Sequence, residues 1–214
     1  MSELVQEIIL KIFGNNPILA TIFISMIPIV ELRGAIPFGS SKEIWGDRAL
    51  SVFEAGVYSV IGSIITAIII ILLLIPVFNV LRKSKIFVRV VKVFEEKFNK
   101  KSNEITVESK NNALKKWLGI MTFVAIPLPL TGVWTGSAIA VFLKMGFLKS
   151  FTAVSVGALI AATIMMTVSK TLGDSAIYIF YSFIIIFIVL IAIYSLKAFF
   201  KRNDDKGNNE NQKK

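Results

Sequence analysis

The sequence predicts an all-α integral membrane protein of two inverted repeats, each a re-entrant helical hairpin followed by a transmembrane helix, plus an extra C-terminal transmembrane helix. Three observations lead to this fold class. Of the 214 residues, 55% are hydrophobic, which is too apolar for a soluble domain. Several uncharged runs have about the 20 residues that a membrane-spanning helix needs. Prolines interrupt two of these runs at matching places in the two halves of the chain.

The first half of the chain divides into three predicted membrane segments. Residues 1–13 place apolar side chains on one helical face, which is typical of a helix lying in the membrane interface. Residues 17–39 are predicted to form the first re-entrant hairpin, because Pro28 and Pro37 interrupt a run otherwise long enough to cross. A polar loop then leads into a transmembrane helix over 50–81.

The second half repeats the hairpin and the helix after a basic connection. Residues 82–116 are rich in Lys and Arg, and part of the segment has amphipathic spacing, which favours a helix on an anionic membrane surface. The segments that follow are a second re-entrant hairpin over 117–140, transmembrane helices over 150–170 and 175–200, and a polar, disordered tail over 201–214.

Charge placement predicts the orientation in the membrane. If each hairpin returns to the side it entered from, the basic segment 82–116, the loop with Lys144 and Lys149, and the basic C-terminal tail all lie inside. If both broken segments crossed fully, that loop and that tail would lie outside. Because cytoplasmic loops carry the excess of Lys and Arg, we expect a multi-pass protein of the cytoplasmic membrane with a cytoplasmic C-terminus.

Glu31 and Arg33 lie in the middle of the first interrupted run. A charge at that depth costs about 2.5–3.5 kcal/mol on insertion scales and usually marks an ion or substrate path. Arginine suits an anionic group because its planar fork donates two hydrogen bonds to a phosphate or carboxylate. Two interpretations stay open: a binding site, or an ion pair that only holds the hairpin together.

Further candidates surround this pair. Thr131 and Thr135 would add polar groups in the second hairpin, and Glu54 is either an interfacial carboxylate or a proton site. Ordinary kinked spans are the alternative to hairpins, since membrane helices tolerate proline. The residues predicted to set the breaks are Pro28, Gly34 and Pro37 in the first hairpin, and Pro127, Pro129, Gly132 and Gly136 in the second.

Composition argues against several other functions. The chain has no histidine and no cysteine, which removes the usual ligands of transition metals and two common nucleophiles. We therefore expect no cofactor, no metal and no enzyme such as a lipid phosphatase or an intramembrane protease. The net charge of +10 is explained by membrane orientation, so we expect no nucleic-acid partner.

Two motifs resemble those of a known family. Glu31-Leu32-Arg33-Gly34-Ala35-Ile36-Pro37 and Pro127-Leu128-Pro129-Leu130-Thr131-Gly132-Val133-Trp134-Thr135-Gly136 are similar to the two signatures of the small multidrug export proteins. That family distantly resembles the DedA/VTT membrane proteins. The resemblance implies two inverted re-entrant hairpins and a transport role, with a polyprenyl phosphate or phospholipid as one candidate cargo. The second basic residue of DedA-type hairpins is absent here, where Thr131 or Thr135 stands instead.

These observations together predict a transporter with a midplane site between the hairpin tips. Arg33 would bind an anionic or amphipathic substrate such as a lipid phosphate, and Glu31 would take up a proton or pair with Arg33 when the site is empty. Alternatives are a lipid flippase or scramblase without ion coupling, and a membrane assembly factor that transports nothing. Membrane lipids are expected partners, while proton or sodium coupling and a homo-oligomer stay open.

Overall fold

The structure is a computed structural model of the chain, and it describes residues 11–81, 110–128, 130–179, 181–183, 185–186 and 188–193. These residues form helices and no strands, which confirms the predicted all-α class. Most of the predicted interfacial helix 1–13, most of the basic segment 82–116, Pro129 and the tail 201–214 lie outside the described residues.

The described α-helices differ in length, from 4 residues in α4 to 30 in α5. Two are long, with 30 residues in α5 and 26 in α9, or about 45 and 39 Å at 1.5 Å per residue. In order, the elements are α2 (Pro17–Met26), α3 (Glu31–Gly39), α4 (Lys42–Trp45), η1 (Gly46–Arg48), α5 (Val52–Leu81), α7 (Lys110–Ala125), α8 (Val133–Phe142), α9 (Phe147–Leu172) and η2 (Gly173–Ala176), followed by helical residues within 177–193.

The short helices have local signals at their ends. Asn16 accepts a hydrogen bond from the Leu19 N–H at 3.1 Å, and Pro17 takes the first helical position of α2. Pro28 and Pro127 lie between helices, where a missing N–H costs no helical bond. With 10, 9 and 10 residues, α2, α3 and α8 are each about 15 Å long, or half the thickness of a hydrocarbon core.

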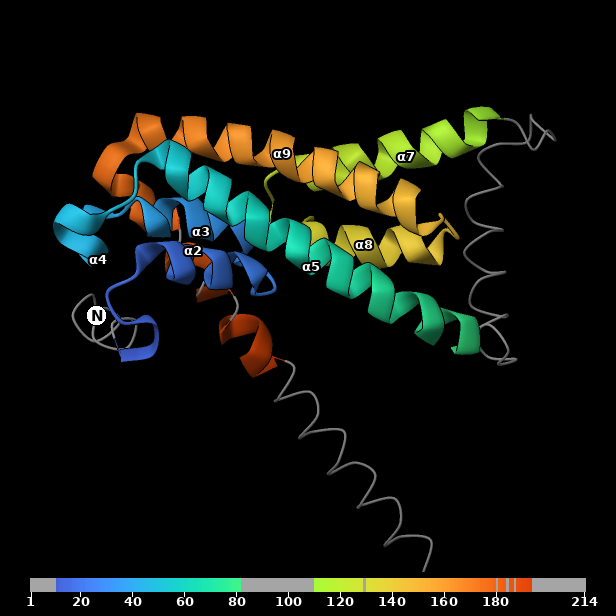
Figure 1. The fold of residues 1–214 in the computed structure, drawn as a ribbon, viewed down its shortest axis with the longest axis horizontal. Coiled ribbons are helices and arrows are strands. Elements are labelled where there is room, and N and C mark those ends of the chain that lie inside the picture. Colours follow the sequence, from blue (N-terminus) through green and yellow to red (C-terminus); the bar gives the residue numbers. More distant parts are fainter. Residues whose placement is uncertain are drawn as a thin grey trace, which may run out of the picture.

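The two long helices run antiparallel along the whole bundle, and each pair of short helices covers one half of it (Figure 1). The pair α2–α3 lies at the end where α5 begins and α9 ends, and the pair α7–α8 lies at the opposite end. Besides the contacts within each pair, α2 packs on α5, α3 on α5 and α9, α7 on α9, α8 on α5 and α9, and α5 on α9. The connections within the two pairs therefore meet near the middle.

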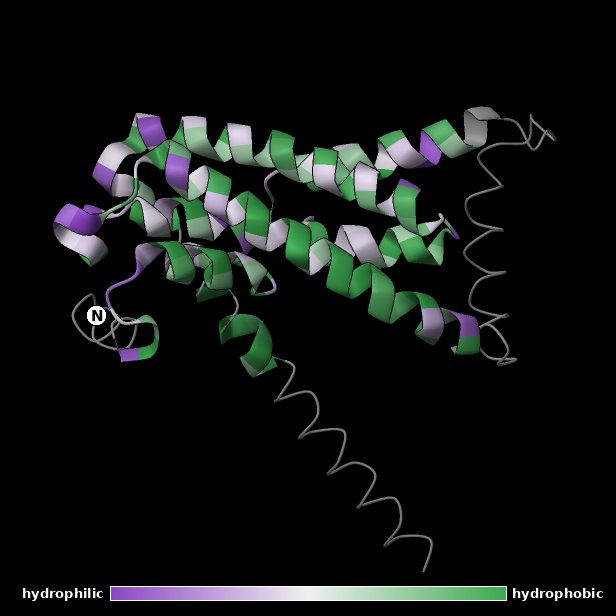
Figure 2. Ribbon diagram, in the orientation of Figure 1, coloured by the Kyte–Doolittle hydropathy of each residue, from purple (hydrophilic) through white to green (hydrophobic). Residues whose placement is uncertain are grey.

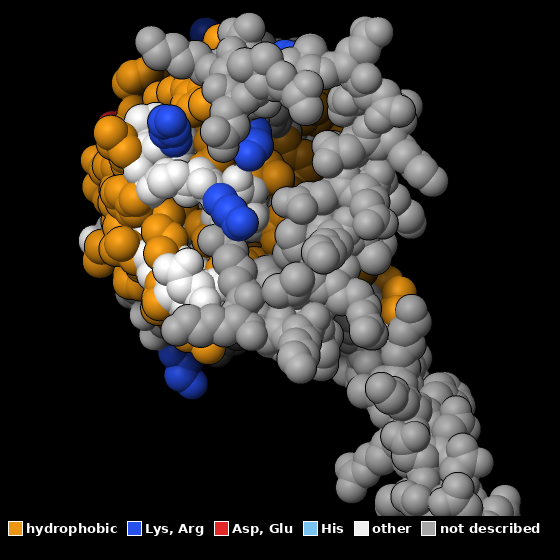
Figure 3. Space-filling model, turned by 90° about the vertical axis from the view of Figure 1, so that its right-hand side faces the viewer, with side chains coloured by type: hydrophobic (Ala, Val, Ile, Leu, Met, Phe, Trp, Pro, Cys, Tyr) orange, Lys and Arg blue, Asp and Glu red, His pale blue; other side chains and the backbone are white. Residues whose placement is uncertain are grey.

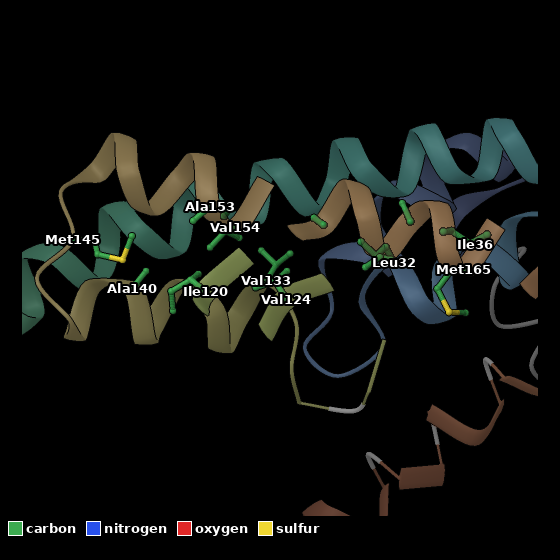
Figure 4. Close-up of a cluster of buried hydrophobic side chains, with 14 residues drawn as sticks. Leu32, Ile36, Ile120, Val124, Val133, Ala140, Met145, Ala153, Val154 and Met165 are labelled. Carbon is green, nitrogen blue, oxygen red and sulfur yellow. The ribbon is translucent and has the colours of Figure 1, made fainter. Parts of the chain in front are cut away.

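A buried apolar cluster joins the two halves through this middle (Figure 4). It contains Leu32 of α3, Val124 of α7, Val133 of α8 and Val154 of α9, all at most 3% exposed. A second cluster packs α2, α3 and α4 against Ile177 and Tyr181, which follow η2. The first cluster fixes the start of α3 against the facing ends of α7 and α8.

Hydrophobic residues fill the middle of the bundle and hydrophilic ones gather toward its ends (Figure 2). Two helical stretches, Val52–Val80 and one within Phe147–Ile193, are long and apolar enough to cross a membrane. Many of their large apolar side chains are exposed, including Leu73 at 59% and Ile188 at 59%. Exposed apolar surface of this extent on long helices is what a lipid environment accommodates.

The two ends of the bundle differ in charge. Lysines stand among apolar side chains at the end where α7 begins (Figure 3); they are Lys115, Lys116, Lys144 and Lys149, and the described residues 110–128 and 142–150 contain no Asp or Glu. The opposite end mixes both signs, with Lys42, Glu43, Asp47, Arg48, Glu54, Lys170 and Asp174.

Candidate functional site

The connection between α2 and α3 turns sharply so that Glu31 begins α3 inside the bundle. Ile29 and Glu31 have φ angles of 75° and 45°, in the left-handed region that non-glycine residues rarely adopt. The Glu31 N–H still donates to the Ile27 carbonyl at 3.0 Å. Strained backbone of this kind persists where the surroundings over-determine it, and it gathers at functional sites.

The Glu31 carboxylate caps a helix of the other half of the chain. Its Oε2 accepts a hydrogen bond from the Val133 N–H at 3.2 Å, and its Oε1 accepts one from the Trp134 N–H at 3.2 Å. These are the first two N–H groups of α8, and the N-cap residue Gly132 supplies no side chain for them. An anion at this end of a helix meets unpaired donors and the positive end of the helix dipole.

Arg33 caps the C-terminal end of α7, where it donates hydrogen bonds to backbone carbonyls. Its Nη2 donates to the carbonyls of Val124 and Ile126 at 3.3 and 3.0 Å, where the helix leaves carbonyls without partners. Its Nη1 binds Glu31 Oε2 at 2.8 Å. Arg33 and Glu31 are 1% and 3% exposed, so one buried ion pair complements both helix ends at the second break.

The second break adds its own hydroxyls around this pair. Thr131 Oγ1 accepts a hydrogen bond from Arg33 Nη2 at 3.2 Å and lies 2.7 Å from the Ile126 carbonyl. Thr135 Oγ1 donates to the Leu130 carbonyl at 2.5 Å. The Trp134 indole N–H donates to the Met26 carbonyl at 3.0 Å, which ties the start of α8 to the end of α2.

Gly132 lets the two breaks approach this closely. A Cβ built at Gly132 would overlap the Glu31 carboxylate, although the φ of Gly132, −89°, is open to any residue. The need for glycine is therefore steric and comes from the Glu31 side chain rather than from the backbone. An alanine at this position would displace the carboxylate.

The structure brings some of the predicted site residues together and separates others. Arg33 contacts both Glu31 and Thr131, whereas Thr135, in the first turn of α8, bonds among the described residues to the Leu130 and Gly132 carbonyls of the second break. Glu54 lies apart: it is exposed in the first turn of α5 and accepts hydrogen bonds from the Ser51 N–H and Oγ at 2.8 and 2.7 Å. Ala55 beside it packs against Gly39, at the far end of α3 from Glu31.

The residues predicted to set the breaks also separate. Pro28 and Pro127 lie in the breaks and Gly132 begins α8, but Gly34 and Pro37 lie inside α3 and Gly136 lies inside α8. The helix resumes before Pro37, whose missing N–H forgoes one bond near the end of α3. Gly136 instead makes room for the Val124 side chain of α7.

The partners that sequence reasoning missed are backbone groups. The carbonyls of Val124 and Ile126 receive Arg33, and the carbonyl of Met26 receives Trp134. No sequence pattern marks such acceptors except the helix end itself, which the Ile126-Pro127 step indicates.

This geometry defines a helical protein with two long apolar helices and a buried charged junction between two broken segments. A family model described as "Putative small multi-drug export protein" matches residues 31–164, from the start of α3 to within α9. The match spans more than half of the chain, and the protein belongs to this family. No curated protein and no solved structure matches the chain. Together with the apolar helices, the family indicates an export protein of the membrane rather than an enzyme.

Proposed function

We propose that the protein is a multi-pass membrane transporter with its substrate site where the two breaks meet. One observation carries the proposal: Glu31 and Arg33 are buried at the middle of an apolar bundle and bind both helix ends of the other half. Charges at such depth are costly and mark ion or substrate paths. Broken helices whose ends converge at mid-depth are the usual way in which transporters build a binding site.

An inverted repeat is the architecture that we propose around this site. If α2, α3 and α5 are exchanged with α7, α8 and α9, the helix contacts map onto one another: α2–α5 becomes α7–α9, α3–α5 becomes α8–α9, and α3–α9 becomes α8–α5. The pairs α2–α3 and α7–α8 would then be re-entrant hairpins that enter from opposite sides; α2, α3 and α8 are each about half a membrane long, and α7 has 16 residues. This exchange supports repeats over 17–81 and 117–170.

Two glycines support the same relation at the level of single contacts. A Cβ at Gly62 in α5 would meet the Ile22 carbonyl and the Ser25 side chain of α2. A Cβ at Gly157 in α9 would meet the Met121 carbonyl and the Val124 side chain of α7. The α2 and α7 partners match one another position for position in the alignment of the two Ile-Pro steps. Each long helix thus packs on its own hairpin through an equivalent close contact.

Charge supports an orientation with the lysine-rich end in the cytoplasm. Lys115, Lys116, Lys144 and Lys149 lie there without acidic neighbours among the described residues, and the opposite end is mixed in sign. Cysteines at Asp47 and Lys149, both exposed, test this in a chain that has none of its own. Labelling of intact cells by an impermeant reagent should occur at 47 and not at 149. Labelling at 149 alone would mean that the orientation is the reverse of the one proposed. Labelling at both positions would mean that the second half has no re-entrant hairpin.

Transport itself is tested with purified protein in liposomes. We expect movement of an anionic or amphipathic substrate, with a lipid phosphate as the leading class, because Arg33 provides a planar cation at the junction. Rocking of one repeat against the other would open the junction to each side in turn. The assay measures translocation of anionic lipids against a neutral lipid. Equal rates with wild type and with empty liposomes for every lipid would favour an assembly factor that transports nothing.

Ion coupling separates the two transport mechanisms. Translocation that responds to an imposed proton or sodium gradient indicates a secondary transporter, whereas movement that ignores both gradients indicates a scramblase. The protein-free liposome is the control for leakage in both cases.

A further inference from the structure

We infer that the Glu31 carboxylate occupies the place of a substrate oxyanion, and that the oxyanion binds when Glu31 takes up a proton and leaves. This inference rests on the proposed transport function and names the substrate class and coupling at that site. The ligand chemistry is a phosphate or carboxylate group, carried by a lipid or by a small soluble anion.

The donors around the carboxylate form a complete oxyanion site. The N–H groups of Val133 and Trp134 at 3.2 Å and the Arg33 Nη1 at 2.8 Å all converge on its two oxygens. Two N-terminal N–H groups with a guanidinium are the donor set that binds phosphates and carboxylates generally. Since Gly132 has no side chain there, an oxyanion can approach the backbone closely.

Arg33 has capacity beyond its present partners. Its Nε is buried and has no hydrogen-bond partner among the described residues, while its Nη groups bind Glu31, two carbonyls and Thr131. A buried donor without a partner is costly. A phosphate has more acceptor oxygens than a carboxylate, so it can engage an additional guanidinium N–H.

The site cannot hold two anions at once. Arg33 is the one charged side chain in contact with Glu31 among the described residues of every helix packed there, α7 and α8 included. A second anion next to an ionised Glu31 would meet a like charge in a buried setting, which opposes binding. A proton taken from the aqueous side neutralises Glu31, weakens its hold on the three donors and removes this repulsion. Oxyanion and proton therefore enter together.

The second break offers a route from the membrane. Ile126, Leu128 and Leu130 are 44%, 55% and 51% exposed, and Thr131, next along the chain, bonds to Arg33. An amphiphile could keep its tail on this apolar surface while its head reaches Thr131 and Arg33. This geometry favours a lipid-borne oxyanion over a soluble one, and the experiment distinguishes them.

Calorimetry on the full chain in neutral detergent tests the inference. The probe is a short-chain phosphatidylglycerol, whose phosphate diester keeps one charge between about pH 5 and pH 8; dimethyl phosphate is the soluble arm, and a short-chain diacylglycerol is the uncharged control. Titrations in two buffers of different ionisation enthalpy give the protons taken up on binding. We expect about one proton per lipid near neutral pH, and tighter binding as the pH falls.

Glu31→Gln removes the internal anion. We expect it to bind phosphatidylglycerol about tenfold more tightly than wild type at neutral pH, with no proton uptake and little pH dependence. Asp47→Asn, an exposed carboxylate on η1, should keep the wild-type proton uptake. If Glu31→Gln does not fold, the wild-type pH profile decides alone. Weaker binding in acid, binding without proton uptake, or equal binding of diacylglycerol would each overturn the inference.

The outcomes separate this inference from the transport proposal. Tighter binding of the lipid than of dimethyl phosphate assigns a lipid source, and equal affinity assigns a soluble one; both support the oxyanion site. Translocation in liposomes without proton-linked binding would leave transport standing and remove the inference. Proton-linked binding without any translocation would leave the site standing and remove the transport function.

Discussion

The two helix breaks share a backbone plan but differ in chemistry. The first, at residues 27–30, is short and at least half-buried, and it delivers Glu31 and Arg33 into the bundle. The second, at residues 126–132, exposes three large apolar side chains, and the described residues from 117 to 143 carry no charge. At the second break, Glu31 accepts from the first two N–H groups of α8, and Arg33 donates to the Val124 and Ile126 carbonyls at the end of α7, where Thr131 also bonds to Ile126.

The difference shows how two similar helix breaks can form one polar site when only one of them carries charged residues. Two identical uncharged breaks would leave four helix ends with unpaired polar groups in an apolar interior. Placing one acid and one base in the first turn of α3 serves both helix ends at the second break, because the two helix ends have opposite partial charge. The same arrangement concentrates polar chemistry at a single point on the bundle axis.

Among the variants, Arg33→Ala should have the largest effect on stability and translocation, because Arg33 links the two breaks. It strands the Glu31 carboxylate and frees the α7 carbonyls, and losing one partner of a buried pair costs about 3–5 kcal/mol. We expect a large fall in melting temperature and no translocation in liposomes. Arg33→Lys should be intermediate, since an ammonium keeps the charge and loses the planar fork.

The double variant Glu31→Gln with Arg33→Gln tests whether the ion pair forms a binding site or only holds the structure together. It removes both charges together, so its stability should lie closer to wild type than that of Arg33→Ala. A stable double variant without translocation places the guanidinium in the transport step. Full translocation by the double variant would make the pair purely structural and defeat the site assignment.

Gly132→Ala should have the next largest effect. The added Cβ meets the Glu31 carboxylate, so the cap on α8 must shift, at a cost of about 1–3 kcal/mol. We expect lower stability and reduced translocation. Gly119→Ala in α7 is the matched control, because among the described residues no atom beyond its own stretch of helix lies within 4 Å of the added Cβ; it should be neutral or slightly stabilising. Equal losses in both variants would contradict the proposed close approach.

The sequence predicted the breaks better than it predicted their partners. Pro28 and Pro127 removed N–H groups from two long apolar runs, which is a local signal, and both lie between helices. The contact between Glu31 and the α8 N–H groups joins residues about one hundred positions apart, and no local rule specifies it. Arg33 was a candidate from its depth alone, but its carbonyl partners depend on tertiary packing.

The positions of three predicted break residues inside helices also depend on tertiary packing, which the sequence does not show. Gly34, Pro37 and Gly136 look like break residues, since glycine and proline disfavour helix interiors. The neighbouring helix decides otherwise for Gly136, which accommodates Val124. Glu54 was ambiguous between interface and cavity, and its hydrogen bonds to Ser51 place it at an exposed helix start.

Gly62→Ala and Gly157→Ala test a close helix contact that the two halves of the chain share. Each new methyl group meets a backbone carbonyl of the first helix in its own half, Ile22 in α2 for Gly62 and Met121 in α7 for Gly157. Because a backbone carbonyl cannot move aside as a side chain can, we expect both variants to lose about 1–3 kcal/mol. Chemical denaturation in detergent measures the two losses side by side. A loss confined to one half would argue against the inverted repeat.

The smallest expected effects come from Thr131 in the second break and Thr135 in the first turn of α8. Thr131→Val removes a hydroxyl that accepts from Arg33 Nη2, and Thr135→Val removes one that bonds to the backbone carbonyls of Leu130 and Gly132. Each should lower stability by about 1 kcal/mol, the usual net value of one hydrogen bond.

Translocation should separate the two threonine variants although their stabilities are similar. Thr131→Val leaves Arg33 short of a partner and removes a polar group beside the proposed oxyanion site, so its rate should fall several-fold. Thr135→Val should keep a rate near wild type, because its hydroxyl contacts no charged group of the junction among the described residues. Equal rates in the two variants would confine the site to the first break; a greater loss in Thr135→Val would move it toward α8.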